Sequence, residues 1–177
     1  MNLHYRTATP DDAVQIQTLL HSAFRAIDSR PGWTADERIN ASFTLPLDFI
    51  LATINRENGN YHMAFDDEGN LVACFAMAKK SDERSRFAMF AIDPKHQRGG
   101  LGRKVIGYAE DYALKTWGVK RMDLNVLSTR QELTSWYERC GYRKTGETEP
   151  FRYEYVPEKL PEGLYLVVLE KPLPAAA

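Results

Sequence analysis

The chain has 177 residues, of which 44% are hydrophobic and 27% are charged, and we expect one water-soluble domain with a single core over residues 1–177. Its formal net charge of −1 disfavours nucleic acid as the main partner, because binding to a phosphate backbone usually needs a basic face. No apolar run approaches the ~18 residues of a membrane helix, and Met1–Arg6 has no apolar signal core, so we expect no membrane partner and a cytoplasmic location.

The N-terminal part predicts one strand and two helices. Residues 3–8 alternate in polarity and predict a short strand. A helix begins at Pro10, where two acids complement the first-turn dipole and an apolar stripe follows at helical spacing. That stripe consists of Val14, Ile16, Leu19, Leu20 and Phe24. Residues 28–45 look irregular, and residues 46–57 predict a second helix.

The middle of the chain predicts three consecutive strands. Residues 60–66 and 71–79 predict a hairpin, because Asp66–Asn70 between them is rich in turn residues. Residues 86–92 form an almost continuous apolar run, which is typical of a strand buried on both faces.

Two helices separated by a strand follow. Residues 100–117 predict a helix that ends at Gly118, and residues 120–127 predict the strand. The second, shorter helix ends at Gly141. Its apolar positions are Leu133, Trp136, Tyr137 and Cys140.

The chain closes with two expected strands, at about 142–155 and 163–170, and with an expected frayed tail at about 172–177. The strand–helix–strand unit at 86–127 implies local parallel pairing, whereas the hairpins imply antiparallel pairing. We therefore expect an α/β (α+β) fold, with a mixed, twisted sheet and helices on both faces.

Cysteine and histidine give no sign of a metal site. Cys74 and Cys140 look like reduced core thiols, as in a reducing compartment. The four histidines are scattered and no zinc-type spacing occurs, so we expect no metal.

The stretch Ile92–Lys104 carries the chemistry. An expected buried strand ends near Pro94, and three glycines then precede a helix. Glycines let backbone amides approach a ligand, and a helix start adds unpaired amides and partial positive charge, so the segment suits a pyrophosphate. A glycine-rich surface turn is the alternative. The nucleoside-triphosphate and dinucleotide loop motifs are both absent.

The pattern resembles motif A of the GNAT acetyltransferase superfamily, [QR]-x-x-G-x-[GA] after a V/I-x-P strand end. It stands here as Ile92-x-Pro94 followed by Gln97-x-x-Gly100-x-Gly102. Trp136–Tyr142 resembles the family's helix ending in Y-E-[KR]-x-G-[FY]. Further blocks resemble one uncharacterised, small bacterial-type branch, and together the matches fall between residues 3 and 173. Those blocks are Pro31–Thr34, Thr145–Glu147, Pro150–Phe151 and Val168–Leu173.

The resemblance implies a sheet that splays between the strands at 86–92 and 120–127, with acetyl-CoA as co-substrate. The pantetheine arm would lie along the first of these strands, and the pyrophosphate at the loop. The implied pantetheine residues are Phe90, Ala91 and Ile92. The implied pyrophosphate residues are Gln97, Arg98, Gly99, Gly100, Leu101, Gly102 and Arg103.

The resemblance also implies that Tyr137 lies near the thioester sulfur and protonates the leaving thiolate. The alternative for Tyr137 is packing in the core. Two positions depart from the family pattern. Arg130 stands where many relatives carry an Asn that bonds the pantetheine arm, and Arg86 stands where some carry a Glu base.

The sequence also offers candidates for the acceptor side. Trp33 and Phe151 are expected to line the acceptor mouth, although Trp33 could simply anchor its loop. Glu147 and Glu149 could act as a base through water, or be solvated strand ends. Asp36 and Glu37 lie in the same irregular segment as Trp33, which often borders the acceptor site in such enzymes, but they could instead be helix N-terminal acids. His96 is expected to be an exposed loop residue.

The resulting hypothesis is an enzyme that moves an acetyl group from acetyl-CoA to a primary amine by direct attack in a ternary complex. The alternative is a non-catalytic coenzyme A-binding sensor or interaction module. A longer acyl donor, a homodimer and the identity of the amine are left open.

Overall fold

The computed structural model describes residues 1–26, 30, 33, 37–152 and 162–174. Its strands form one seven-stranded sheet in the order β1-β2-β3-β4-β5-β7-β6. The strands are β1 (His4–Thr7), β2 (Gly59–Phe65), β3 (Leu71–Lys79), β4 (Arg84–Ile92), β5 (Arg121–Leu127), β6 (Arg143–Pro150) and β7 (Tyr165–Pro172). The expected mixed sheet is confirmed, since β4 and β5 pair in parallel and every other neighbouring pair is antiparallel.

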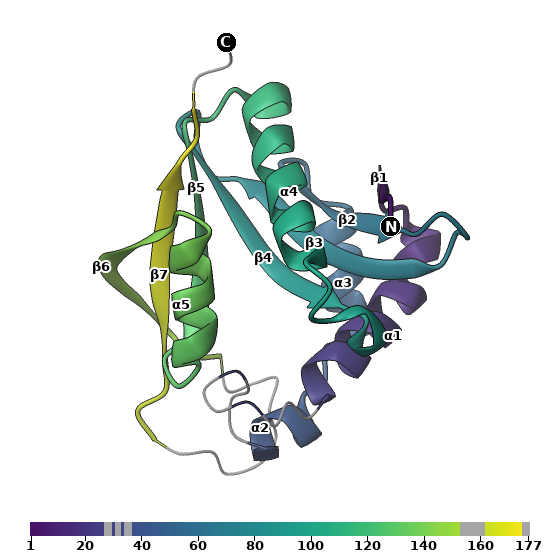
Figure 1. Cartoon of the computed structure of the whole chain (residues 1–177), viewed down its shortest axis with the longest axis horizontal. Helices are drawn as coiled ribbons and strands as arrows, with labels where there is room; N and C mark the ends of the chain where they lie inside the picture. Colours follow the sequence, from purple (N-terminus) through teal and green to yellow (C-terminus); the bar gives the residue numbers. More distant parts are fainter. Residues whose placement is uncertain (27–29, 31–32, 34–36, 153–161, 175–177) are drawn as a thin grey trace.

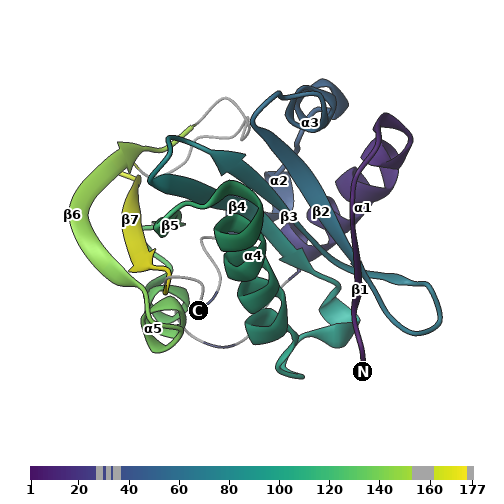
Figure 2. The same cartoon turned by 90° about the horizontal axis from the view of Figure 1, so that it is seen from above.

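Helices cover both faces of the sheet. On one face of β2–β4 lie α1 (Ala13–Arg25) and α3 (Leu47–Ile54), and on the other lies α4 (Leu101–Trp117) (Figure 2). A fourth helix, α5 (Gln131–Arg139), packs on the β5-β7-β6 part. Short 3-10 turns at Pro10–Asp12 and Pro94–His96 precede α1 and α4.

The sheet divides the expected single core into two large apolar clusters, one on each face, and a small third cluster contains Ile39 and Leu127. The two large clusters explain why the central strands are continuous apolar runs. Side chains alternate along a strand, so Phe75 and Met77 of β3 pack with α4, while Cys74 and Ala76 pack with α1 and α3. Both faces of β3 are therefore buried, and the strand needs apolar residues at successive positions.

A bulge interrupts β4 near its end. Cys74 pairs with Ala91 while Ala76 pairs with Ala88, so β4 carries one residue more than β3 across this interval. Met89 adopts φ 51°, a conformation uncommon for a residue with a side chain. The bulge returns Phe90 to the α4 face, where it packs against the same core as Phe87.

The sheet splits at β4 and β5. These strands pair only where Arg84–Arg86 meets Arg121–Asp123, and beyond that point they diverge (Figure 1). The rest of β4, from Phe87 onward, therefore faces a gap on its β5 side.

Three details differ from the sequence-based expectation. A short helix, α2 (Glu37–Ser42), lies in the segment expected to be irregular, and the strand expected at 142–155 ends at Pro150, with residues 153–155 outside the described residues. The expected frayed tail begins too early. β7 continues through Pro172, and Leu173 is buried and donates its backbone N–H to the Lys120 carbonyl at 2.7 Å.

Candidate active site

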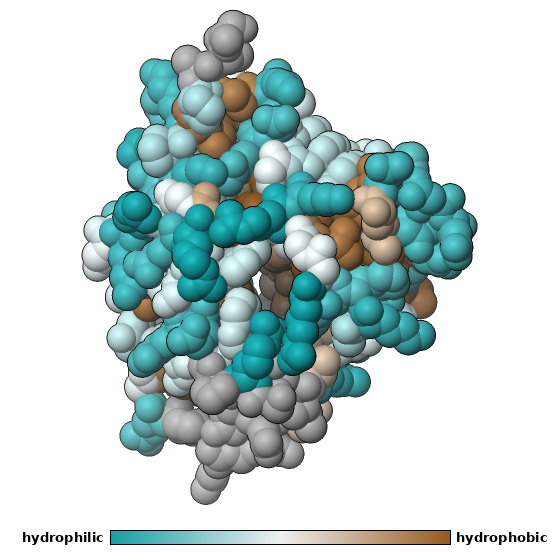
Figure 3. All heavy atoms as spheres, viewed as in Figure 1, coloured by the Kyte–Doolittle hydropathy of each residue, from teal (hydrophilic) through white to brown (hydrophobic). Residues whose placement is uncertain are grey.

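A cleft of about 1760 Å³ occupies the gap between β4 and β5. Figure 3 shows a hollow near the centre of this face, with hydrophilic side chains around it. A site for one small molecule usually has a volume of ~300–1,000 Å³. The cleft therefore has room for two substrates side by side.

The loop at one end of the cleft is held by its own side chains. The Asp93 carboxylate accepts a hydrogen bond from the Lys95 backbone N–H at 3.0 Å, and the Gln97 amide donates to the Ile92 carbonyl at 3.2 Å. Arg98 and Gly100 adopt φ of 71° and 76°, so the chain turns sharply before α4. Gly100 is the N-cap of α4 and has no side chain to cap it, which leaves first-turn amides for an external anion.

The structure brings most of the predicted cofactor residues to the cleft wall. Eight of them line it: Phe90, Ile92, Gln97, Arg98, Gly100, Leu101, Gly102 and Arg103. Ala91 is buried and its side chain packs in the core formed with α1 and α3, so its backbone alone could serve a ligand in the cleft. Gly99 is exposed and is not among the described lining residues.

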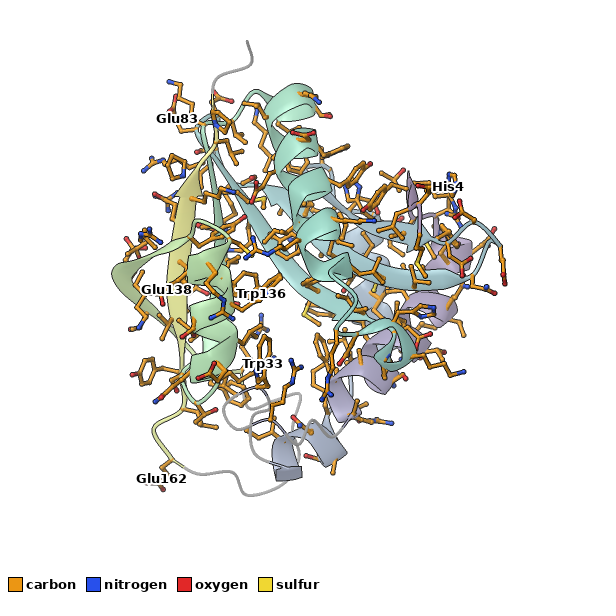
Figure 4. The ribbon with its side chains drawn as sticks, in the orientation of Figure 1. His4, Trp33, Glu83, Trp136, Glu138 and Glu162 are labelled. Carbon is orange, nitrogen blue, oxygen red and sulfur yellow. The ribbon has the colours of Figure 1, made fainter. Side chains whose placement is uncertain are left out.

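Trp136 is a lining residue that the sequence analysis did not assign to the site. It extends from α5 toward the start of α4 (Figure 4). A Cβ placed on Gly102 would lie 3.0 Å from its Cζ2 atom. The absence of a side chain at this position therefore allows the indole to pack closely against the start of α4. The sequence could have indicated Trp136 as a site residue, because it directly precedes Tyr137 in the Trp136–Tyr142 motif.

Tyr137 is only 6% exposed and is not among the described residues that line the cleft. Its ring packs edge-on against Trp136, with centroids 5.0 Å apart, and against Tyr142. Burial raises the pKa of its phenol above the usual value, so the hydroxyl is protonated at neutral pH. Among the described residues the hydroxyl has no hydrogen-bond partner. Its role as a general acid stays a prediction.

A charged cluster lies at the apex of the gap, where β4 and β5 last pair. The sequence did not predict it. Arg86 is the last β4 residue paired with β5, and its guanidinium bonds both Asp123 of β5 and Glu149 of β6. The Glu149 carboxylate also accepts a hydrogen bond from the Asn125 amide at 2.7 Å. Hydrogen bonds from Arg86 lower the Glu149 pKa below its usual value.

This cluster changes the prediction for a carboxylate base. Glu149 lines the cleft, but its lowered pKa makes it a weak proton acceptor at neutral pH. Glu147 is exposed on β6 and is not among the described lining residues. Asp36 lies outside the described residues, and Glu37 begins α2. His96 lies in the loop, where its Nδ1 atom is 3.7 Å from the Asp93 Oδ2 atom, and it is one of the residues that line the cleft.

Trp33 and Phe151 both line the cleft. The backbone carbonyl of Trp33 accepts a hydrogen bond from the Arg130 Nε atom at 2.7 Å, and the Arg30 guanidinium lies 4.2 Å from the Trp33 ring centroid. Phe151 packs against Ile39 and Leu127. Arg130, which departs from the family's Asn, therefore ties α5 to the Trp33 segment, and Figure 4 shows Trp33 below Trp136 at the same gap.

Within the described part of the chain, no group of three His, Cys, Asp or Glu side chains is placed to hold a metal ion. No helix there has the length and apolar character needed to cross a membrane.

Comparisons with known proteins point in one direction. Residues 16–142 match the model of the acetyltransferase (GNAT) family. The chain is 26% identical over 159 residues to the S-(2-succino)cysteine N-acetyltransferase of Bacillus subtilis (strain 168), covering 84% of this chain and 89% of that protein.

Solved structures share the fold at low identity. A putative phosphinothricin N-acetyltransferase superposes with a TM-score of 0.72 at 16% identity, covering 98% of this chain and 99% of that one. Spermidine N-acetyltransferase from Vibrio cholerae, in complex with CoA and spermine, superposes with a TM-score of 0.69 at 17% identity, covering 97% and 95%.

Proposed function

The chain belongs to the acetyltransferase (GNAT) family and is an N-acetyltransferase, and from this premise we propose that its cleft binds acetyl-CoA and a primary amine together. The observation that carries the proposal is the separation of β4 from β5 after Arg86. It leaves the β5 side of β4 open next to a loop suited to a pyrophosphate, in a cleft large enough for two molecules.

Acetyl-CoA would enter from the loop end. Its pyrophosphate would lie over Gln97–Arg103, where first-turn amides of α4 and two arginines supply hydrogen-bond donors and positive charge. Its pantetheine arm would follow Phe90–Ile92 and pair with backbone groups that β5 does not satisfy. Trp136 would flank the arm from the α5 side.

The transfer itself needs few protein groups. After its ammonium form has lost one proton to solvent water, the amine nitrogen attacks the thioester carbonyl. An N–C bond forms, the C–S bond breaks, and the nitrogen loses a second proton to water. The carbonyl oxygen gains negative charge in this step, and we propose that a backbone N–H at the bulge near Met89 and Phe90 stabilises it. The departing thiolate takes up a proton, for which we propose the Tyr137 phenol.

Two acceptor classes come from the comparisons. The Bacillus subtilis relative is named for a cysteine derivative that carries a 2-succino group on its sulfur, and the Vibrio cholerae enzyme is named for a polyamine. We propose that the chain acts on an amine of small-molecule size, since both names describe small molecules and Trp33 and Phe151 line the same cleft as the proposed acetyl-CoA residues. The free thiols of Cys74 and Cys140 suit the reducing cytoplasm that we propose as its location.

Titration calorimetry and a thiol-release assay test this function together. We expect acetyl-CoA to bind the purified protein, coenzyme A to be released only when an amine is added, and mass spectrometry to find the acetylated amine. Tight binding with no amine-dependent release across amino acids, polyamines and simple amines would support the sensor instead. Propionyl- and butyryl-CoA in the same assay would show whether a longer acyl group is preferred.

A further inference from the structure

We infer that Glu149 receives the acceptor amine: its carboxylate binds the ammonium group and then orients the attacking nitrogen. This inference rests on the proposed acetyl transfer and deepens it, since it assigns recognition of the amine to one side chain. Three features support it: a chain of alternating charges that ends at Glu149, the way in which the carboxylate is fixed, and its position relative to the bulge in β4.

Six charged side chains from four neighbouring strands form a chain in which cations and anions alternate. Its members, in order, are Arg121, Glu170, Arg84, Asp123, Arg86 and Glu149. Each of the four inner members has an oppositely charged neighbour on both sides, at distances of up to 3.8 Å. The two ends differ, because Arg121 is not among the described residues that line the cleft, whereas Glu149 is.

Glu149 is therefore the end of this chain that faces the cleft. Arg86 is its one ion-pair partner among the described residues, and Arg86 divides its charge between Glu149 and the buried Asp123. Lys80 acts on Glu149 only from farther away. Glu149 is also the single carboxylate among the described lining residues. A cation bound there would continue the alternation of charge and be attracted by it.

The Glu149 carboxylate is fixed in its charged form and still has room for another donor. Its Oε1 atom accepts one hydrogen bond from Arg86, and its Oε2 atom accepts one from Arg86 and one from Asn125. These bonds lower the pKa of the carboxyl, so it is ionised at neutral pH. An ionised carboxylate has about four acceptor positions, which leaves one on Oε1. The side chain is 37% exposed, so an ammonium group can approach it.

Glu149 also lies within reach of the proposed thioester position. It is bonded to Arg86, and the bulge at Met89, where we propose the oxyanion, comes three residues farther along β4. Three residues span at most ~10 Å. A hydrogen bond, the forming N–C bond and the carbonyl group fit within that length, so one small amine can contact Glu149 and the thioester together.

This arrangement gives the carboxylate two consecutive roles. An alkylamine arrives as its ammonium form, because its pKa is close to that of lysine, and one proton then passes to water. The neutral amine keeps an N–H bond to Glu149, which directs its lone pair away from the carboxylate and toward the carbonyl carbon. As the N–C bond forms, the nitrogen gains positive charge, and the neighbouring anion stabilises it until the second proton leaves to water. Glu149 thus selects amines that are cations in neutral water over neutral arylamines and alcohols.

The first test separates recognition of the amine from turnover. Ligand-observed NMR on the protein saturated with coenzyme A, which has no acetyl group to transfer, would measure dissociation constants for alkylamines, benzylamine and amino acids. Each would be paired with the alcohol of the same carbon skeleton, and aniline would be added as a neutral amine. We expect the tightest-binding amine to bind about tenfold more tightly than its alcohol. Equal affinities, or tighter binding of aniline, would overturn the inference and leave acetyl transfer intact. No coenzyme A release with any amine in the thiol-release assay would overturn the proposed function instead.

Three variants then locate the recognition. Glu149→Gln keeps the size of the side chain and removes its charge, so the ratio of the alcohol and amine dissociation constants should fall by about tenfold. Glu149→Asp keeps the charge and should retain more of the preference for the amine. Glu147→Gln removes the same charge from an exposed residue two positions earlier on β6 and should leave the ratio unchanged. The ratio compares two ligands of the same folded protein, so partial unfolding of a variant does not alter it. A ratio that persists in Glu149→Gln would contradict the assignment.

Discussion

The guanidinium of Arg86 on β4 and the carboxylate of Glu149 on β6 form a two-bond ion pair at the apex of the cleft, with distances of 2.7 and 3.2 Å. The pair joins the two halves of the split sheet at the point where β4 and β5 part. It also fixes the ionisation of the carboxylate that the acceptor would meet.

Replacing Arg86 should move the pH dependence of amine use. Arg86 lowers the Glu149 pKa, so Arg86→Gln should raise it, and the acid limb of kcat/KM for the amine should shift to higher pH. Stability should fall as well, because the buried Asp123 loses a charged partner. Glu149→Gln lacks this carboxyl, so its profile of kcat/KM against pH should have no such acid limb. An acid limb in Arg86→Gln at the same pH as in the wild type would refute the role of Glu149.

Gly100→Asp should abolish measurable acetyl-CoA binding. A side chain at this N-cap would project toward the proposed pyrophosphate, and its negative charge would repel the phosphates. Calorimetry on Gly100→Asn separates the two effects, because Asn has a similar size without the charge and also tolerates positive φ. Gly69→Asp is a control at another open position of positive φ, in the β2–β3 turn. Normal affinity in Gly100→Asp would remove the loop from the site.

Tyr137→Phe should lower kcat by about 10²-fold, the lower end of the range for a positioned general acid. Burial raises the phenol pKa, which keeps it protonated but makes it a weaker acid. Acetyl-CoA affinity and melting temperature should barely change. The neighbouring Tyr142→Phe loses a hydrogen bond to Glu110 of 2.9 Å and should reduce stability without reducing kcat. A near-normal kcat in single-turnover measurements of Tyr137→Phe would show that water protonates the sulfur.

Trp33→Ala should mainly impair use of the amine, whereas Trp136→Ala should mainly impair use of acetyl-CoA. The Trp33 ring lies beside Arg30 in the part of the cleft proposed for the acceptor, so its removal should raise KM for the amine by about tenfold, or 1.4 kcal/mol. The Arg130 bond uses the Trp33 backbone and should survive. Trp136 packs on Gly102, so its removal should mainly raise KM for acetyl-CoA. Equal effects of both variants on both substrates would favour a purely structural role for Trp33.

His62 should make the protein less stable as the pH falls from 6.5 to about 4. The His62 side chain stacks on the Phe75 ring, and the residue is only 1% exposed. Both of its ring nitrogens lack a hydrogen-bond partner among the described residues. Burial lowers its pKa from 6.5 to about 4, so within this range the unfolded chain binds a proton that the folded chain does not. The free energy of unfolding should decrease by about 3 kcal/mol in total.

Urea unfolding of His62→Phe at pH 7, 6 and 5 checks this expectation. The variant should keep its stability at pH 7 and lose most of the slope. His21, whose pKa burial also lowers, contributes in the same direction and is unchanged in the variant. The Asp12 carboxyl of the folded protein titrates below this pH range, because hydrogen bonds from Arg6 hold its pKa at about 2. An identical slope in both proteins would assign the effect to other groups.

The order of most elements and the position of the loop followed from the sequence alone. Hydrophobic periodicity and glycine placement are local properties, so they located α4, the buried run of β4 and the turn between them. The strand–helix–strand unit and the hairpins predicted the mixed sheet, and the family resemblance, which depends on local motifs, predicted its split. The short helix α2 was missed because residues 37–42 lack a clear apolar stripe of their own.

The chemistry of the acceptor end was decided by the tertiary structure. Arg86, Asn125 and Glu149 come from three strands, and pairing in the sheet alone brings them into hydrogen-bonding distance. The lowered pKa of Glu149 depends on that contact and has no trace in its neighbours along the chain. Likewise, the link from Arg130 to Trp33 joins residues 97 positions apart. Local sequence determines backbone shape, whereas electrostatics depends on distances that exist only after folding.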